Sequence, residues 1–422
     1  MDQQISRNTS GLPSRVEGTA DPSFTWAVRA FASLFPRRPG FGGGALAVYL
    51  DGVPVVDVWT GWADRSRTVP WSADTGAVVM SATKGMAATV IHRLADRGLI
   101  DYGAPVAHHW PAFGANGKAT ITVRDVMGHR AGLSRLNGIT KADFLDHRAM
   151  EERVAAAAPD RVLGKSAYHA FTYGWLLAGL ARAVTGKSMR ELFRLELAAP
   201  LGTDGLHLGR PPAGAPTRAA QIITLKRTVA NPRFNSLAPK VAAWPRSGLF
   251  GAMYFPEVRS IVQGEIPLLD TELPGANGVA TARGLARMYG AIANGGMIDG
   301  RQFLSAGVVA NLTGRRSLRI DGNLLLPVAF HLGYHAVPVP GVMPGFGHVG
   351  MGGSVGWADP ASGLAFAFVH NRLHPLTVSD QVMFVPLNAL IRRGAALARN
   401  RGFAAVPDFG APITEPPTTA AS

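Results

Sequence analysis

The sequence predicts an α+β protein in which an antiparallel sheet, flanked by helices, is built from both ends of the chain, with an all-helical domain inserted between. Three observations lead to this prediction. Residues 45–59 and residues 356–370 each contain two apolar, β-rich runs that a tight-turn sequence separates, which is the pattern of a β-hairpin. Between them, from about residue 105 to 300, apolar residues mostly follow helical spacing.

The first expected elements are a polar arm, a short helix and a hairpin. Residues 24–35 have an amphipathic pattern that Pro36 ends. In the hairpin, Asp51-Gly52 is expected to form the turn, because this dipeptide readily adopts the left-handed conformations that a two-residue hairpin loop requires. We therefore assign residues 1–40 to an N-terminal arm and short helix, and residues 41–105 to the first part of the sheet domain.

The middle of the chain is expected to form the helical domain, residues 106–324. Thr122 and Thr281 each precede an apolar run and are expected to cap helices. Residues 208–250 are rich in Pro, Gly and aromatic residues and follow no regular period. Irregular stretches of this length are usually functional or mobile, and we expect a loop that covers the substrate.

The last part of the chain returns to strands and ends in a helix. We assign residues 325–405 to the second part of the sheet domain, with a final helix at about 380–399. Residues 406–422 are rich in Pro and Thr and predict a disordered tail. Because strands stand at both ends of the chain, we expect them to pair in one sheet.

Composition excludes several classes of protein. With no Cys among 422 residues, there are no disulfides and no thiolate chemistry. The His residues show no ligand spacing with carboxylates, so we expect no metal and no cofactor. The net charge of +14 comes from dispersed Arg without a basic block, so we do not expect nucleic-acid binding.

The protein is expected to be cytoplasmic. No apolar stretch is long enough to span a bilayer, and the polar N-terminus lacks the apolar region of a secretory signal. Weak peripheral contact with acidic lipid or the cell envelope, through the 24–35 helix, stays open as an alternative. A helix packed on the edge of the domain is the favoured interpretation of this segment.

The most informative motif is Ser81 with Lys84, in the segment MSATKGM at 80–86. Only seven of the 42 basic residues are Lys, and Lys84 is the sole one among the first hundred residues. Residues three apart on a helix share a face, so Ser81 and Lys84 would form a nucleophile and its base. An arginine could not act as the base, because a guanidinium keeps its proton in proteins. An amphipathic surface helix is the alternative for this short motif.

A rival serine is Ser354, in the segment GGSVG at 352–356. This matches the G-x-S-x-G turn in which a nucleophile stands between a strand and a helix. A β-rich run follows Ser354 instead of a helix, and Asp359 and His370 lie too close together in sequence for an ordinary triad. We therefore interpret Ser354 as part of a glycine-rich turn.

Two further segments occur in a fixed order after Ser81 and Lys84: SAYHAFTYGW at 166–175 and GFGHVGMGGS at 345–354. Together these motifs resemble the serine β-lactamase and penicillin-binding-protein superfamily, and within it the esterase branch of family VIII carboxylesterases. The segment ITVRDVMGHRAGL at 121–133 is similar to a loop near that family's active site. The resemblance covers about residues 40–400 and implies a β-lactamase/transpeptidase-like fold.

The resemblance also implies roles for individual residues. Ser81 would be the nucleophile, Lys84 its base or the partner that orients the base, and Tyr168 the catalytic tyrosine that protonates the leaving group. Tyr173 is the rival position for that tyrosine. His348 and Gly350 stand where the family has its Lys-Thr-Gly strand motif. The backbone N–H groups of Ser81 and Met351 would form the oxyanion hole.

Two departures from the β-lactamases point to neutral substrates. No Lys follows Lys240, so His348 replaces the lysine that helps hold a substrate carboxylate. Ala170 stands where class C enzymes have an Asn that contacts the substrate amide. We expect a serine hydrolase of short- to medium-chain carboxylic esters that works through an acyl-enzyme. The alternatives are a lactonase, amidase, transacylase, weak β-lactamase or D-peptidase, or a non-catalytic membrane-binding relative.

Overall fold

The computed structural model describes residues 11–135, 139–224, 251–252, 267–314, 316–374 and 381–406. Its main sheet has nine strands in the order β1-β3-β2-β15-β14-β13-β12-β11-β10, and every neighbouring pair is antiparallel. The strands are β1 (Glu17–Ala20), β2 (Gly43–Leu50), β3 (Val53–Gly61), β10 (Arg319–Ile320), β11 (Pro327–His331), β12 (Tyr334–Ala336), β13 (Phe346–Val349), β14 (Val355–Asp359) and β15 (Leu364–His370).

The predicted antiparallel sheet built from both chain ends is confirmed. Strand β15 pairs with β2, so that Ala367 lies opposite Ala47 and the two ends of the chain share one sheet. The turn between β2 and β3 is formed by Asp51 and Gly52, with φ of 50° and 78°. Both residues have left-handed backbone conformations, which a two-residue hairpin turn requires if it is to match the twist of the strands.

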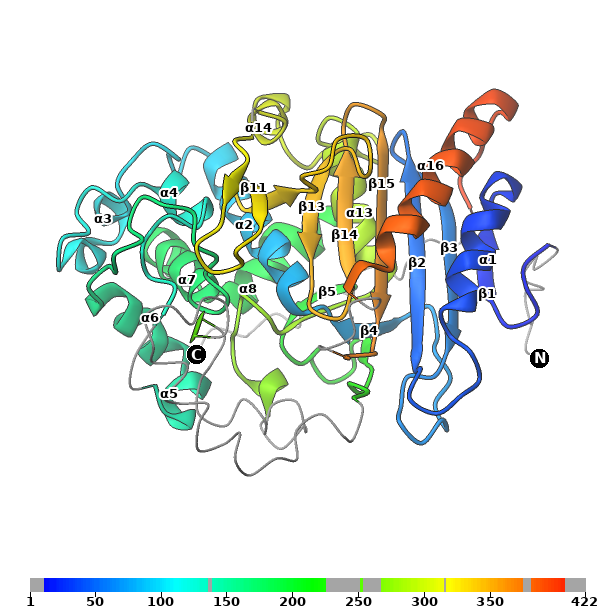
Figure 1. Cartoon of the computed structure of the whole chain (residues 1–422), viewed down its shortest axis with the longest axis horizontal. Coiled ribbons are helices and arrows are strands. Elements are labelled where there is room, and N and C mark those ends of the chain that lie inside the picture. Colours follow the sequence, from blue (N-terminus) through cyan, green and yellow to red (C-terminus); the bar gives the residue numbers. More distant parts are fainter. Residues whose placement is uncertain are drawn as a thin grey trace, which may run out of the picture.

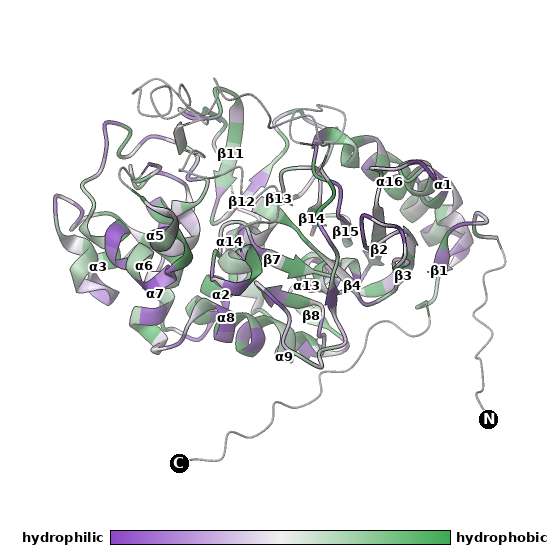
Figure 2. Ribbon diagram, turned by 90° about the horizontal axis from the view of Figure 1, so that it is seen from below, coloured by the Kyte–Doolittle hydropathy of each residue, from purple (hydrophilic) through white to green (hydrophobic). Residues whose placement is uncertain are grey.

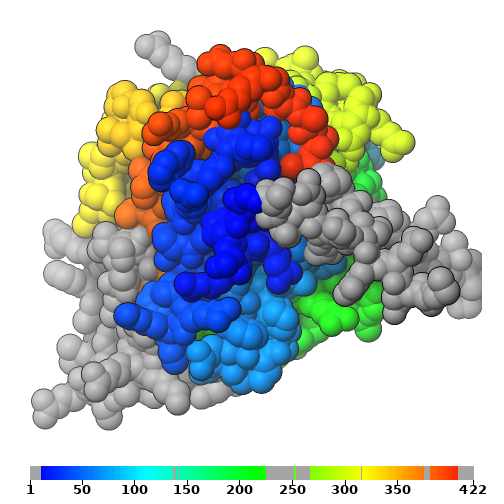
Figure 3. Space-filling view, turned by 90° about the vertical axis from the view of Figure 1, so that its right-hand side faces the viewer, coloured from blue at the N-terminus to red at the C-terminus, as the bar shows by residue number. Residues whose placement is uncertain are grey.

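Helices from the two chain ends cover one face of this sheet. They are α1 (Thr25–Ser33) and α16 (Phe384–Arg401), which lie beside each other in blue and red in Figure 3. The apolar face of α1, including Val28 and Phe31, is buried in a core that also contains Leu387 and Ile391 of α16. The helix expected at 24–35 is therefore packed on the edge of the domain, as favoured from the sequence.

The opposite face of the sheet packs against α2 (Thr83–Asp96) and α13 (Ala282–Ala293). Helix α13 contacts β15, β2 and β14, although its residues lie in the range assigned to the helical domain. Its buried residues, such as Leu285 and Tyr289, join the core beneath the sheet. Helical periodicity predicts an apolar face but not which layer that face contacts.

The helical block lies at one end of the sheet, on the left in Figures 1 and 2. Its helices are α3 (Val106–His109), α4 (Val123–Met127), α5 (Lys141–Leu145), α6 (His147–Ala156) and α7 (Thr172–Thr185), with α8 (Met189–Leu192), α9 (Ala199–Leu201) and α14 (Ala306–Leu312) nearer the sheets. The expected caps are present: Thr122 forms a capping box with Asp125, and the Thr281 side chain accepts from the Gly284 N–H.

A second, four-stranded sheet has the order β5-β7-β4-β6, and three of its strands, all except β4, come from the range assigned to the helical domain. Its strands are β4 (Thr75–Val78), β5 (Leu206–Leu208), β6 (Arg218–Ala219) and β7 (Gly278–Ala280). The range 106–324 is thus helical with short strands added. These strands have two to four residues, which is too short for an alternating pattern to be recognised.

Two expectations fall partly or wholly outside the described residues. Of the loop expected at 208–250 the structure describes only residues 208–224, and of the tail expected at 406–422 only residue 406. At the N-terminus, residues 17–20 belong to the expected polar arm but form β1, which extends the sheet by pairing with β3.

Candidate active site

Ser81 lies where β4 leads into α2. The connection contains Met80, whose φ of 48° is left-handed, followed by the 3-10 turn η2 (Met80–Ala82). A non-glycine residue in this conformation costs about 1–3 kcal/mol and persists only where its surroundings hold it. Here the Thr83 hydroxyl donates to Met80 O at 2.6 Å and accepts from Gly278 N–H at 2.9 Å. The turn therefore presents Ser81, half-buried, at the N-terminus of α2.

Lys84 is one helical turn after Ser81 and is fully buried. Its Nζ lies 3.1 Å from Ser81 Oγ and 2.7 Å from the carbonyl oxygens of Ala170 and Gly275. The amine is thus surrounded by three oxygen atoms, two of which can only accept. A neutral amine has two N–H groups, which the carbonyls accept, and its lone pair is then left to face the serine hydroxyl.

Burial changes the protonation of Lys84. Removal from water lowers the pKa of Lys84 from 10.5 to about 7, because the charged ammonium loses its hydration. No carboxylate is among the causes of the shift. Near neutral pH a substantial fraction of the Lys84 side chain is therefore an amine able to accept a proton.

Tyr168 approaches Ser81 from the loop that precedes α7. Its hydroxyl donates to Ser81 Oγ at 2.9 Å, and its ring stacks on Phe330 with centroids 5.8 Å apart. Burial raises the pKa of Tyr168 well above its usual value, an effect that the hydrogen bond to Ser81 opposes and the nearby charge of Asp321 adds to. Tyr168 therefore stays a neutral phenol, which can donate a proton.

The backbone of Tyr168 is held by Asp321, a fully buried carboxylate. Asp321 Oδ1 accepts from Tyr168 N–H at 2.9 Å, and Oδ2 accepts from the Ser166 hydroxyl at 2.8 Å. The same carboxylate accepts from the N–H groups of Asn323 and Leu324 at 2.9 and 3.0 Å, while the Asn323 amide donates to Tyr168 O at 2.9 Å. The turn that begins at Asp321 thus fixes the loop that carries Tyr168.

Two buried histidines support the same loop from the other side. His129, with a left-handed φ of 57°, accepts from His169 N–H at 3.1 Å through Nδ1. His169 in turn hydrogen bonds Ala167 O through Nδ1 and accepts from Leu133 N–H through Nε2. Burial is the main cause that lowers the pKa of both imidazoles. They are neutral at physiological pH and order the loop through hydrogen bonds.

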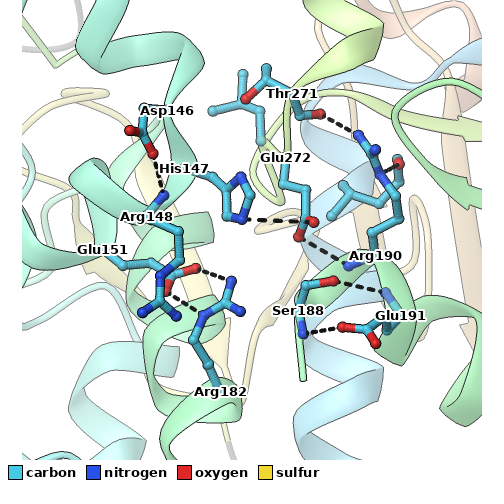
Figure 4. A network of polar contacts seen from close by, with 12 residues as sticks. Asp146, His147, Arg148, Glu151, Arg182, Ser188, Arg190, Glu191, Thr271 and Glu272 are labelled. Atoms are coloured by element: carbon cyan, nitrogen blue, oxygen red, sulfur yellow. Dashed lines mark hydrogen bonds and ion pairs between the residues drawn. The ribbon is translucent and has the colours of Figure 1, made fainter. Parts of the chain in front are cut away.

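The segment that leads to Gly275 is held by a network of polar contacts in the helical block, and Figure 4 shows this network at Thr271 and Glu272. Glu272 is buried, accepts from Arg190 N–H at 3.1 Å and lies 3.8 Å from His147 Nε2. The Arg190 guanidinium donates to Thr271 O at 3.0 Å. These contacts tie the segment that carries Gly275 to α6 and α8, so the helical block defines one wall around Lys84.

The third predicted motif lies on β13 and the turn after it. A Cβ on Gly350 would lie 2.1 Å from Val79 O, so the glycine lets this turn pack directly against the turn of Ser81. Met351, half-buried, is the next residue. His348 is buried and lies with its ring 5.0 Å from that of His335. Burial, and then the charges of His335 and Lys84, lower the pKa of His348 well below its ordinary value.

Among the described residues, neither of the two rivals, Ser354 and Tyr173, makes a hydrogen bond with Ser81. Ser354 is buried in the turn between β13 and β14, and its Oγ lies 3.3 Å from the backbone nitrogen of His370. Strand β14 follows it, where a nucleophile turn would need a helix. The Tyr173 ring packs against His129 with centroids 4.5 Å apart, and a Cβ on Gly333 would lie 2.6 Å from its hydroxyl.

Sequence reasoning did not single out Asp321 or the carbonyls of Ala170 and Gly275. The segment around Asp321, IDGNLL at 320–325, has the composition of an ordinary turn. Only its hydrogen bonds to the Tyr168 loop distinguish it. Backbone carbonyls carry no sequence signal, because every residue has one.

In the part of the chain that the structure describes, no helix has both the length and the apolar character that crossing a membrane requires. No cluster of three or more His, Asp or Glu side chains suited to a metal ion occurs among the same residues.

Comparisons with known proteins agree on one family. The family model described as Beta-lactamase matches residues 28–382. A protein named Esterase/beta-lactamase LipL, from Mycobacterium tuberculosis (strain ATCC 25618 / H37Rv), is 66% identical over 404 residues, which cover 95% of this chain and 94% of that protein. The chain therefore resembles this relative over almost its whole length.

Solved structures support the same assignment. A family VIII carboxylesterase is similar with a TM-score of 0.76 at 32% identity, covering 89% of this chain and 99% of that one. A penicillin-binding protein homologue from Caulobacter crescentus is similar with a TM-score of 0.74 at 30% identity, covering 91% of this chain and all (100%) of that one. The chain therefore belongs to the beta-lactamase family and is a serine hydrolase.

Proposed function

We propose that this protein hydrolyses short- to medium-chain carboxylic esters through an acyl-enzyme on Ser81. One observation carries the proposal: Ser81 Oγ lies within hydrogen-bond distance of both the buried Lys84 amine, at 3.1 Å, and the Tyr168 hydroxyl, at 2.9 Å. A nucleophile with a base and a proton donor at these distances is suited to acyl transfer.

The pKa values of the two partners assign their roles. With its pKa near 7, Lys84 accepts the Ser81 proton as Oγ attacks the ester carbonyl. Tyr168, held neutral by burial, gives its proton to the leaving alkoxide and takes the proton back from the Lys84 ammonium. Water then attacks the acyl-enzyme with the same groups acting in reverse, and the acid is released.

The developing oxyanion needs two donors, and we assign them to the backbone N–H groups of Ser81 and Met351. The close contact of Gly350 with Val79 brings these two turns together. Ser81 stands at the N-terminus of α2, where the helix dipole favours negative charge. One oxyanion donor typically contributes about 10²–10³-fold in rate.

The surroundings of Tyr168 favour an apolar, uncharged acyl group. Tyr168 and Ala170 form an apolar cluster with Phe171, Leu324 and Phe330. A β-lactam carries a carboxylate that needs a cation, whereas His348, which replaces the family lysine, is kept neutral by its lowered pKa. We therefore expect rapid turnover of p-nitrophenyl butyrate and little turnover of nitrocefin.

The relative named Esterase/beta-lactamase LipL keeps β-lactam hydrolysis as the second candidate. Comparable kcat/KM values for the ester and nitrocefin would contradict the preference for neutral substrates. A panel of lactones, amides and D-amino-acid peptides, assayed with and without an alcohol acceptor, would distinguish the lactonase, amidase, peptidase and transacylase alternatives.

The assignment of the nucleophile is tested with a fluorophosphonate probe and peptide mapping by mass spectrometry. We expect the label on Ser81, loss of label in Ser81→Ala, and full labelling in the matched control Ser354→Ala. A label on Ser354 would overturn the mechanism. A protein that takes no label and cleaves no ester would instead be a non-catalytic member of the family.

A further inference from the structure

The hairpin formed by β10 and β11 exposes an unusual concentration of apolar side chains. Leu325, Ile320 and Leu326 are 70%, 69% and 62% exposed, the highest values for large apolar residues in the described part of the chain, and Leu318 is 55% exposed. All four lie within nine residues, 318–326, which we call the apolar hairpin. Single exposed apolar residues are ordinary, but a cluster of this kind marks a contact surface.

The geometry of the turn holds this surface outward. Leu325 has a left-handed φ of 57°, a conformation that is unfavourable for a leucine. The turn is closed by hydrogen bonds from Asp321 N–H to Leu326 O at 3.0 Å and from Leu325 N–H to Asp321 O at 2.9 Å. Its backbone is thus fixed in a conformation that directs an apolar side chain into solvent at some energetic cost.

The apolar hairpin stands at the end of the main sheet. Strand β10 is the last strand in the sheet order, and β11, its partner, lies at the end of the sheet that faces the helical block in Figure 1. The same turn holds the Tyr168 loop through Asp321, and Leu324 packs toward Tyr168. The exposed leucines therefore belong to the same turn that holds the Tyr168 loop.

The charge of this region identifies the partner. Between Arg301 and Ala358 the sole acidic residue is Asp321, which is buried. Arg319 is exposed between Leu318 and Ile320, and the chain as a whole has a net charge of +14. Exposed apolar side chains with an exposed Arg among them, in a segment without an exposed acid, are complementary to a surface of anionic lipid headgroups over acyl chains.

We propose that the apolar hairpin binds anionic lipid surfaces. Helix α1 is the weaker candidate for this contact, because its apolar face is buried in the protein core and Trp26 is its one strongly exposed apolar side chain among the described residues. Lipid binding does not require hydrolysis, so the proposal stands apart from the proposed function.

The test is co-sedimentation of the full chain with vesicles of phosphatidylcholine, with and without phosphatidylglycerol. We expect binding to the anionic vesicles that weakens with added salt. The double variant Ile320→Thr/Leu325→Asn should lower the partition constant about tenfold or more. Asn adopts the left-handed conformation readily, so this variant should keep its fold, and unchanged p-nitrophenyl acetate hydrolysis would verify that.

Control variants make the result decisive. Leu195→Gln, at an exposed leucine on the helical block, and Trp26→Ala, on α1, should bind vesicles like the wild type. The same measurements in a Ser81→Ala background should give the same partition constants, so a failure of the hydrolytic mechanism would not affect the result.

Three outcomes would overturn the proposal: no binding by the wild type, equal binding by the double variant, or loss of binding in Trp26→Ala. Analytical ultracentrifugation adds a fourth. A wild-type dimer that the double variant converts to a monomer would show that the apolar hairpin contacts a second copy of this chain instead of lipid.

Discussion

Replacement of Lys84 by Met removes the proposed base and, at the same time, a buried amine whose protonation should make the free energy of unfolding depend on pH. In the folded protein Lys84 is neutral above about pH 7, whereas in the unfolded chain a lysine stays protonated up to about pH 10.5. Between these values the unfolded chain binds more protons than the folded one. The free energy of unfolding contributed by Lys84 must therefore rise with pH across this window.

The magnitude follows from the burial of the amine. Lowering the pKa from 10.5 to about 7 corresponds to roughly 4–5 kcal/mol at ~1.4 kcal/mol for each pKa unit. Nearly the whole of this cost to stability is present at pH 7, where the folded protein must either bury an ammonium or release its proton, and it disappears as the pH rises toward 10.5. Relative to Lys84→Met, the wild type should gain roughly 2–3 kcal/mol between pH 7.5 and 9.5.

The measurement is urea unfolding of both proteins across this pH range, followed by tryptophan fluorescence. Lys187→Met, at an exposed lysine, serves as the control and should show no such rise against the wild type. In parallel, kcat/KM of the wild type for p-nitrophenyl butyrate should increase through a pH of about 7 and then level off, as Lys84 becomes a base.

A difference in the free energy of unfolding between the wild type and Lys84→Met that is the same at every pH would refute this reasoning. It would mean that Lys84 titrates alike in the folded and unfolded states. A kcat/KM midpoint near pH 10 would lead to the same conclusion from the kinetic side, and the hydrogen bonds to Ala170 and Gly275 would then hold an ammonium.

Three further predictions concern the groups around Ser81. Tyr168→Phe should lower kcat about 10²–10⁴-fold with an unchanged melting temperature within a few degrees, since only the hydroxyl is lost; a normal kcat would exclude Tyr168 as the proton donor. Gly350→Ala, whose Cβ would lie 2.1 Å from Val79 O, should abolish fluorophosphonate labelling, while its circular dichroism spectrum should still be that of a folded protein. Full labelling of this variant would disprove the close contact of the two turns. Asp321→Ala should lower kcat at least about tenfold and also reduce the free energy of unfolding by about 1–3 kcal/mol, because the Tyr168 N–H loses its buried acceptor. Asp321→Asn keeps that acceptor and should retain most of the activity. Equal losses of kcat in the two variants would mean that the charge of Asp321 matters and not its position.

Much of the fold was accessible from local sequence patterns. Local patterns predicted the two hairpins, the caps at Thr122 and Thr281, and the helix after Ser81. Each of these features depends on residues within a few positions of one another, so the residue types themselves favour it. The layer against which each helix packs was not accessible. Helix α13 was grouped with the helical domain, although its apolar face is buried under the main sheet.

The same division applies to the candidate site. Ser81 and Lys84 are one helical turn apart, so their spacing alone brings them to one face. The lowered pKa that suits Lys84 to the proposed role of base comes from its burial, and its amine contacts the carbonyls of Ala170 and Gly275, which are 86 and 191 positions away. No local pattern predicts that environment.

The sequence alone therefore determined the pairing of Ser81 with Lys84, the order of the motifs and the antiparallel sheet. Tertiary structure decided the lowered pKa of Lys84, the anchoring of Tyr168 by Asp321 and the exposure of the apolar hairpin. The physical reason is that desolvation depends on which distant segments exclude water from a side chain, and this is settled only when the whole chain packs.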